Sequence, residues 1–525
     1  MFRRTFLLLV FFTAFACKKN APPAPMPKPI HTAAINNEGI VIDSLFVKRV
    51  ADSTTAAFYR SNNFKSVWDN KKDREIVTLA LSRADLDGLD PKDYRAKELF
   101  YLESRYAKLN QREIAEYDLK LTVNLAKFLL HMMQGKLNPR ELYKNWDLPR
   151  KKIDINSIIA EAIVGDSLEQ AIASARPKHF MYASLQQGLR QIRTLPKDHF
   201  RPFDTDMRKL SCNDTSEIVL RIKKRLIYWK DLKKSDSLTN LYDHQMCNAV
   251  KRFQSRHGLA SDGVIGKATL EALNFTREKR REQIVANLER WRWFPRNFSN
   301  HYLIVNIPGY TLHVVKDGDT VMEKRIVVGK LERRTPVLTS TFSNIVFNPT
   351  WTVPPTIIRE DLVPSASKNR SYFAEREIDI FDGKNNAVNP EAWNPAKPGN
   401  YRYVQRPGDN NSLGNVKFNF PNHYTVYLHD TNHRDFFARN RRSLSSGCVR
   451  VEDPLPLAEY MLDSKEWTLD KILEKIATKE TTYVKVRNHI NIYQLYWTAW
   501  SENGQLVFRD DIYALDGELY DRLRN

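Results

Sequence analysis

Apolar side chains recur at intervals of three and four residues through most of the first 200 positions, which is the spacing of one face of a helix. The clearest example contains Leu121, Leu125 and Phe128, and Gly135 provides a stop. No cluster of catalytic residue types accompanies these helices. We therefore predict a helical scaffold domain over residues 40–205.

A smaller helical unit is predicted over residues 214–275. Its first helix, SEIVLRIKKRLIYW, is amphipathic, a second follows at helical spacing, and a Gly-rich turn leads to a third. Residues 276–300 then predict a basic linker helix. Its two tryptophans, Trp291 and Trp293, can either pack internally or offer a sugar-stacking surface, and we favour packing.

From about Tyr302 the apolar period changes to two, which indicates β-strands. A Lys-Asp-Gly-Asp turn soon after predicts a hairpin. Strand-like runs and short helices continue to the C-terminus, so residues 301–525 predict one mainly-β domain. Residues 360–420 are rich in Asn, Pro and Gly, and an insertion of this length can cover a site as a lid. The expected fold class is multidomain α+β.

The first 17 residues have the pattern of an export signal. Arg3 and Arg4 precede an apolar stretch, and small residues stand before Cys17 as a cleavage site requires. The segment is similar to a lipoprotein signal in which Cys17 is acylated. Ordinary export and an uncleaved anchor helix are the alternatives. Residues 18–39 are rich in Pro, Ala and Lys and predict a flexible tether.

This leader predicts an extracytoplasmic, periplasmic protein that is held on a membrane by a lipid anchor. Lys18 follows the acylated position where an inner-membrane retention signal would carry Asp, so the outer membrane is weakly favoured. The chain has 82 Lys and Arg against 62 Asp and Glu, a formal net charge of +20. Such a surface suits nucleic acid, anionic lipid or an anionic wall polymer. Export removes nucleic acid from this set.

The chain contains four cysteines and no CxxC pair, which argues against thiol-rich zinc and iron–sulfur sites. Cys212 and Cys247 are 35 residues apart in and beside the predicted three-helix unit. An oxidising compartment permits a disulfide between them, and two reduced, buried thiols are the alternative.

The stretch from 426 to 462 carries the candidate chemistry. His429 ends a strand-like run, and Cys448 follows Gly447 and precedes Arg450 by two positions. A thiolate is a nucleophile, an imidazole can take the thiol proton, and a glycine lets peptide N–H groups approach an oxyanion. The arrangement predicts acyl transfer.

Other interpretations of these residues exist. A single Cys is often a buried apolar residue, and a single His is often structural. A zinc site is conceivable because several potential ligands lie close in sequence, namely His423, His429, Asp430 and His433. Their spacing matches no known ligand motif, so we expect no metal and no other cofactor.

The motif HDT…SSGCVRVED resembles the catalytic signature of the L,D-transpeptidases, which have a YkuD-type domain. The similarity is to the large, YcbB-like branch, in which a Ser stands before Gly-Cys as Ser446 does here. Further similar segments include GLDPKDY, NLERWRWFP, YLIVNIPGYTL and YWTAWSENGQLVFRDDIY. Separately, AVKRFQSRHGLASDGVIGKATLEALN resembles a three-helix peptidoglycan-binding domain, with Asp262 and Gly263 in its characteristic turn.

The L,D-transpeptidase resemblance implies a role for each matching residue. Cys448 would be the nucleophile and His429 the general base, with the backbone carbonyl of Asp430 orienting the ring. The N–H groups of Gly447 and Cys448, helped by Tyr427, would form the oxyanion hole. Arg450 would meet a substrate carboxylate or support the loop. No role is transferred to Ser446.

The resemblance also implies the reaction. Cys448 would attack a tetrapeptide stem of peptidoglycan, release the terminal D-amino acid and pass the acyl group to another stem, which gives a 3→3 cross-link. With water as acceptor the protein would be an L,D-carboxypeptidase, and with a protein amine, for instance of an outer-membrane protein, an anchoring enzyme. A non-catalytic wall-binding lipoprotein is the alternative of a different class.

Overall fold

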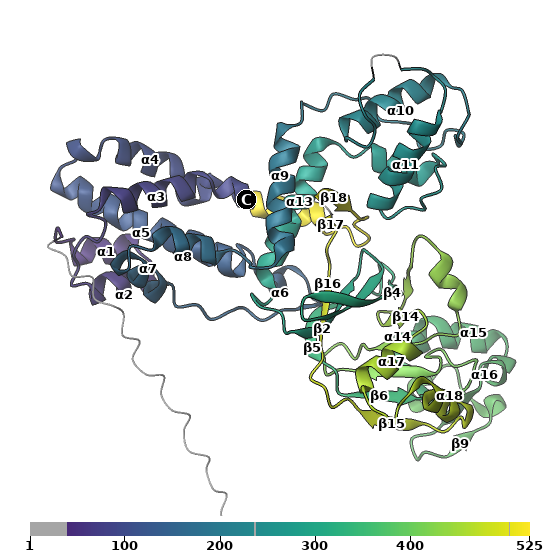
Figure 1. Cartoon of the computed structure of the whole chain (residues 1–525). Coiled ribbons are helices and arrows are strands. Elements are labelled where there is room, and N and C mark those ends of the chain that lie inside the picture. The colour runs from purple at the N-terminus through teal and green to yellow at the C-terminus, as the bar shows by residue number, and fades with distance from the viewer. Residues whose placement is uncertain (1–38, 236–237, 503) are drawn as a thin grey trace, which may run out of the picture.

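The computed structural model describes residues 39–235, 238–502 and 504–525. The predicted signal with Cys17, and residues 18–38 of the predicted tether, lie outside the described residues. Figure 1 shows three lobes: an N-terminal helical lobe, a small helical lobe around α10 and α11, and a β-rich lobe. Helices α9 and α13 lie between them. The α+β fold class predicted from the sequence is confirmed.

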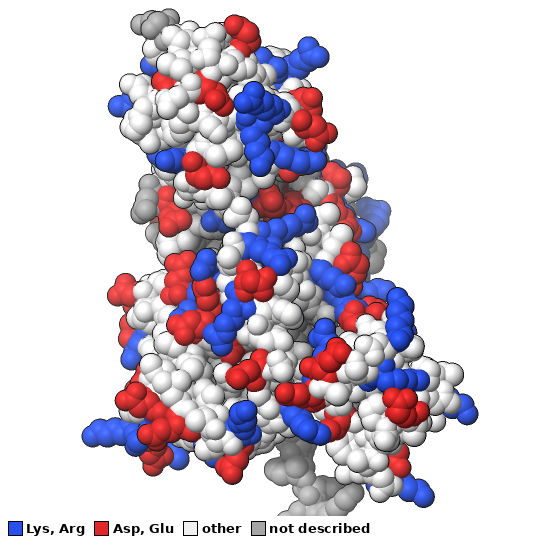
Figure 2. All heavy atoms as spheres, turned by 90° about the vertical axis from the view of Figure 1, so that its right-hand side faces the viewer, with Lys and Arg blue, Asp and Glu red and all other residues white. Residues whose placement is uncertain are grey.

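Charged side chains of both signs are interspersed on the face drawn in Figure 2. The surplus of positive charge does not form one continuous patch on this face. Within the described ranges, no helix is both long enough and apolar enough to cross a bilayer.

The N-terminal lobe is built around a long helix, α5, whose limits follow from its sequence. Asn110 and Glu113 form a reciprocal capping box at its start, and Gly135 ends it with a φ of 89°. Its apolar stripe, including Leu121, Leu125 and Phe128, is buried. The helices of this lobe are α1 (Ser44–Val50), α2 (Ser53–Ser61), α3 (Lys71–Ser82), η1 (Ala84–Asp87), η2 (Pro91–Tyr94), α4 (Ala96–Ser104), η3 (Tyr106–Lys108), α5 (Gln111–Gln134), α6 (Pro139–Leu142), α7 (Ile155–Val164), α8 (Leu168–Ala175) and α9 (Phe180–Thr194).

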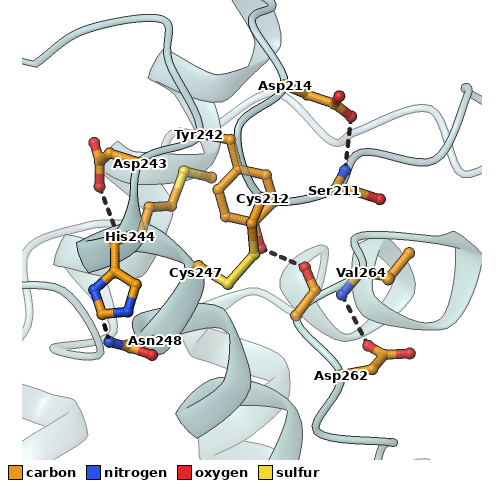
Figure 3. Close-up of a disulfide and its surroundings, with 12 residues drawn as sticks. Ser211, Cys212, Asp214, Tyr242, Asp243, His244, Cys247, Asn248, Asp262 and Val264 are labelled. Carbon is orange, nitrogen blue, oxygen red and sulfur yellow. Dashed lines mark hydrogen bonds between the residues drawn. A yellow bond between two sulfur atoms is a disulfide. The ribbon is translucent and has the colours of Figure 1, made fainter.

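The small lobe consists of α10 (Glu217–Tyr228), α11 (His244–Arg256) and α12 (Lys267–Leu273). Gly263 adopts a φ of 79°, and its N–H donates to the side chain of Gln254 at 2.9 Å. Cys212 and Cys247 form a disulfide beside this turn (Figure 3). The sequence left open whether these two cysteines are bridged or reduced. The structure shows the bridge, which ties the segment before α10 to α11.

The helix predicted as a linker, α13 (Arg277–Trp293), is instead a central element of the core. Every residue from Gln283 to Trp293 is buried, because α13 packs against α5, α9 and the C-terminal helix. One of its buried arginines, Arg292, pairs with Glu289 at 2.7 Å. Trp291 stacks on Trp497 with ring centroids 3.9 Å apart, so it serves packing.

The β-rich lobe contains a 12-stranded sheet in the order β1-β5-β16-β2-β3-β4-β14-β12-β11-β6-β15, with β13 paired to β4. Its first strand comes from the helical lobe and pairs in parallel with β5. The strands are β1 (Trp146–Asp147), β2 (His301–Asn306), β3 (Thr311–Lys316), β4 (Asp319–Gly329), β5 (Val337–Thr341), β6 (Asn344–Phe347), β11 (Val416–Asn419), β12 (Leu428–His429), β13 (Ser443–Ser445), β14 (Val449–Val451), β15 (Thr482–Lys485) and β16 (Asn491–Leu495). The helices η7 (Arg434–Ala438), α17 (Leu455–Leu462) and α18 (Leu469–Ala477) complete it.

A separate four-stranded sheet with its own apolar core forms a cap between β6 and β11. It contains β7 (Trp351–Thr352), α14 (Pro355–Ile357), the π-helical turn η4 (Ile358–Leu362), α15 (Val363–Lys368), α16 (Ser371–Glu375), β8 (Ile378–Phe381), β9 (Ala387–Val388), η5 (Pro390–Ala392), η6 (Pro398–Asn400) and β10 (Arg402–Gln405). The cap thus begins before the predicted insertion of 360–420. Strand β11, which lies inside that predicted range, belongs to the main sheet because Val416 and Phe418 are buried in its core.

The C-terminal segment leaves the main sheet after β16. The hairpin of β17 (Ala499–Glu502) and β18 (Gln505–Phe508) packs against α9 and α13, and α19 (Asp516–Arg524) packs against α13. In Figure 1 these yellow elements lie beside α9 and α13. The predicted β domain of 301–525 therefore includes an end that packs on the helical core.

Candidate active site

Three neighbouring strands carry the candidate residues on one face. Strand β12 lies between β11 and β14, and the register places His429 opposite Lys417 on one side and Arg450 on the other. Their alternate neighbours, such as Leu428 and Val449, are fully buried on the opposite face. The period of two therefore turns polar side chains to the side on which Cys448, just before β14, also lies.

His429 is 4 % exposed, and its Nδ1 faces the carbonyl oxygen of Asp430 at 2.5 Å. A carbonyl only accepts, so Nδ1 carries the proton and Nε2 keeps its lone pair. Burial, and then the charge of Arg450, lower the pKa of His429 to about 3. The ring is therefore neutral at neutral pH and able to accept a proton.

Asp430 places its backbone carbonyl against the ring, while its carboxylate binds neighbouring donors. The carboxylate accepts from the N–H of Asn415 at 2.9 Å and from Arg434 at 3.2 Å. Gly414 has a φ of 58°, and a Cβ there would stand 2.5 Å from the Asp430 carboxyl carbon. Glycine thus permits the close approach that holds Asp430, and with it the imidazole.

Cys448 is the free cysteine of the described residues. Burial raises the pKa of its thiol, whereas the N–H and hydroxyl of Tyr427 and the charges of Lys417 and Arg450 act in the opposite direction. The resting side chain is therefore a neutral thiol. Once it loses its proton, the surrounding donors and cations stabilise the thiolate.

The turn before Cys448 is held by Ser445. Its hydroxyl accepts from the N–H of Gly447 at 3.1 Å and donates to the carbonyl of Cys448 at 2.6 Å. Gly447 has a φ of 116°, which favours glycine. Its N–H, predicted to serve an oxyanion, is thus already bound within the turn. The N–H of Cys448 and the Tyr427 hydroxyl are the other predicted donors.

Ser446 connects this turn to the cap. Its hydroxyl accepts from Arg333 at 2.8 Å, and Arg333 also pairs with Glu360 at 2.5 Å and with Asp361 at 2.7 Å. Both carboxylates belong to η4 of the cap. The guanidinium of Arg333 therefore joins the turn before Cys448 to the cap.

A cleft of about 760 Å³ opens between the main sheet and the cap. Cys448, His429 and Arg450 line one side, and Trp351 and Tyr372 of the cap line the other. The Nε and Nη1 atoms of Arg450 are buried and have no hydrogen-bond partner among the described residues. A buried unpaired guanidinium in a cleft is suited to bind a carboxylate.

Comparisons with known proteins agree with this geometry. A model of the L,D-transpeptidase catalytic domain matches residues 300–480, which include both His429 and Cys448. Residues 300–480 are thus similar to L,D-transpeptidase catalytic domains. Models of a scaffold domain and a peptidoglycan binding domain match residues 53–189 and 215–273.

A curated L,D-transpeptidase homologue from Haemophilus influenzae is 40% identical over 241 residues, which are 45% of this chain and 49% of that protein. The chain thus spans about half the length of this relative. Among solved structures, an L,D-transpeptidase from Mycobacterium smegmatis is 14% identical over 37% of this chain and 58% of its own, with a TM-score of 0.19. Another from Xylanimonas cellulosilytica is 15% identical over 56% of this chain and 100% of its own, with a TM-score of 0.19.

The potential zinc ligands around the candidate site do not converge. His423 is 89% exposed and faces Asp147, whereas the ring of His433 stacks on Phe436. Across the described residues, no three His, Cys, Asp or Glu side chains are grouped as a metal site would need.

Three residues around the candidate site were not found from the sequence: Lys417, Ser445 and Arg333. Lys417 alternates with the apolar residues of β11, so the period of two was a usable signal. Arg333 reaches the site from the β4–β5 loop, and nothing in its local sequence indicates that contact.

Proposed function

We propose that this protein is an L,D-transpeptidase that forms 3→3 cross-links between tetrapeptide stems of peptidoglycan by cysteine chemistry. One observation carries the proposal: the neutral imidazole of His429 and the free thiol of Cys448 line the same covered cleft. A backbone carbonyl orients the imidazole, and the strand that carries it, β12, pairs with β14, which directly follows Cys448. Such a pair supports acyl transfer without a metal or organic cofactor.

In the first half-reaction, Nε2 of His429 takes the proton of the Cys448 thiol. The sulfur attacks the carbonyl of the third stem residue, and the N–H of Cys448 and the Tyr427 hydroxyl stabilise the oxyanion. His429 then protonates the departing amine, which leaves as the terminal D-amino acid, and a thioester remains.

In the second half-reaction, the side-chain amine of a diamino acid in another stem attacks the thioester. His429 takes the amine proton, the new amide forms, and the sulfur leaves and is reprotonated. Arg450 acts earlier, in the first half-reaction, where its unpaired guanidinium suits the carboxylate of the terminal D-residue before that residue leaves.

The leader and the small helical lobe suggest where this happens. We infer a periplasmic lipoprotein anchored through Cys17, with the outer membrane weakly favoured, whose peptidoglycan-binding lobe holds wall polymer. Outer-membrane proteins are additional candidate acceptors, and nucleic acid is not an expected partner.

Incubation of the purified protein with tetrapeptide muropeptides tests the proposal. We expect release of the D-residue and appearance of cross-linked dimers, and Cys448→Ala should abolish both while wall binding persists. Tripeptides without dimers would indicate an L,D-carboxypeptidase. Absence of D-residue release would favour a non-catalytic wall-binding lipoprotein. Inhibition by EDTA but not by thiol alkylation would favour a zinc peptidase.

A further inference from the structure

We propose that Lys417 is a positioning residue that stabilises the Cys448 thiolate, partly through the ring and hydroxyl of Tyr427. The inference deepens the proposed cysteine chemistry and rests on it. Lys417 does not line the cleft, so it acts from beneath the site and does not touch substrate.

The position of Lys417 follows from strand register. Lys417 lies on β11 directly opposite His429 of β12, and His429 in turn lies opposite Arg450 of β14. Its ammonium lies 3.9 Å from the centre of the Tyr427 ring. Within the part of the chain that the structure describes, no carboxylate lies within ion-pair distance of this ammonium.

The charge of Lys417 is therefore available to the reacting sulfur. Burial lowers the pKa of Lys417, and the nearby Cys448 thiolate acts to raise it again. A cation against the face of Tyr427 also draws electron density from the ring, which makes the phenol a better hydrogen-bond donor. Both effects favour negative charge at the sulfur.

The site needs such a cation because His429 cannot readily supply one. With a pKa lowered to about 3, the imidazole gives back an accepted proton easily, so a lasting thiolate–imidazolium pair is disfavoured. Tyr427, just before β12, and Arg450 of β14 also act on the thiol, and His429 of β12 lines the same cleft. Arg333 of the β4–β5 loop is held by Glu360 and Asp361 of the cap.

The relevant step is a simple proton transfer. The S–H bond of Cys448 breaks, its proton moves to Nε2 of His429, and the electron pair stays on sulfur. Lys417 keeps its own proton throughout and lowers the free energy of the charged sulfur by Coulombic attraction.

The test measures the rate at which iodoacetamide alkylates Cys448 in the full-length protein between pH 6 and 10. We expect Lys417→Met to move the rate profile to higher pH and to slow alkylation at pH 7 about three- to tenfold, since one pKa unit corresponds to about a factor of ten. Lys417→Arg should restore most of the rate. Lys485→Met removes an exposed charge from edge strand β15 of the same sheet and serves as the matched control.

Three results would overturn the inference. The first is a Lys417→Met profile that superimposes on that of the parent protein. The second is an equal slowing by Lys417→Arg, which would indicate a packing role. The third is an equal shift by Lys485→Met. Alkylation needs no wall substrate, so a protein that fails to turn over muropeptides but shows the Lys417 effect would refute the proposed function alone.

Discussion

Burial determines the protonation states of the two central side chains, His429 and Cys448. It lowers the pKa of the imidazole to about 3 and raises that of the thiol. Both groups are therefore neutral before substrate arrives. The proton is transferred during reaction, and the surrounding donors and cations determine how readily this happens.

A pH profile of D-residue release should reflect these shifts. Because the His429 pKa is lowered, the base remains unprotonated down to about pH 3, and we expect no loss of kcat/KM near the ordinary histidine pKa. Because the thiol pKa is raised, kcat/KM should keep rising with pH through the ordinary thiol range, at about 8.5. An acidic limb with a midpoint near pH 6.5 would contradict this assignment.

The sequence singles out Cys448 and His429, the proposed nucleophile and base, because they match a known signature. Each residue alone has an ordinary structural explanation, and the resemblance of HDT…SSGCVRVED to the L,D-transpeptidase signature decided between the interpretations. Ser445 and Lys417 are common residue types, and their roles arise only when the turn closes and three strands align. Such roles depend on tertiary register, which local pattern does not contain.

Among the elements, α13 differs most from its prediction. The sequence predicted a basic linker helix with packed tryptophans, and charged side chains are rarely buried. The structure buries two of its arginines in ion pairs: Arg292 with Glu289, and Arg290 with Asp516 at 2.5 Å. Arg290 and Asp516 are 226 residues apart in the chain, so the local sequence around α13 does not reveal that they pair.

Removing one member of the Arg292 pair should therefore be costly. Arg292→Met leaves the buried carboxylate of Glu289 without its guanidinium, and we expect the free energy of unfolding to fall by about 3–5 kcal/mol. Denaturant titration followed by tryptophan fluorescence measures this.

Arg522 provides the control for that substitution. It pairs with Glu518 on the exposed surface of α19, and Arg522→Met should change stability by less than about 1 kcal/mol. Equal effects of the two substitutions would mean that burial of the Arg292 pair has no energetic significance.

For the whole molecule, the sequence predicted the succession of lobes but not how they are joined. The helical lobe adds a strand to the main sheet, and the C-terminal hairpin returns to α9 and α13. Both contacts join segments far apart in the chain, where hydrophobic periodicity indicates burial but not the partner. Both ends of the cap differ from the predicted range of 360–420: the cap begins at β7, before residue 360, and β11 inside that range belongs to the main sheet.

The disulfide should stabilise the small lobe without affecting catalysis. A bridge between residues 35 apart is expected to contribute about 3–4 kcal/mol through restriction of the unfolded chain. We expect the Cys212→Ser, Cys247→Ser double variant to melt earlier in calorimetry, with D-residue release from soluble muropeptides unchanged at 25 °C. Unchanged melting, or loss of that release, would contradict this separation.

Strand β1 also has a consequence for any attempt to isolate the catalytic part. A polypeptide that begins at residue 300 lacks Trp146 and Asp147, which pair with β5. The backbone N–H and C=O groups of β5 then lose these partners, and β5 becomes an open sheet edge. Open edges recruit strands from other molecules. Such a fragment would be prone to self-association, and two residues of the helical lobe protect the intact protein from it.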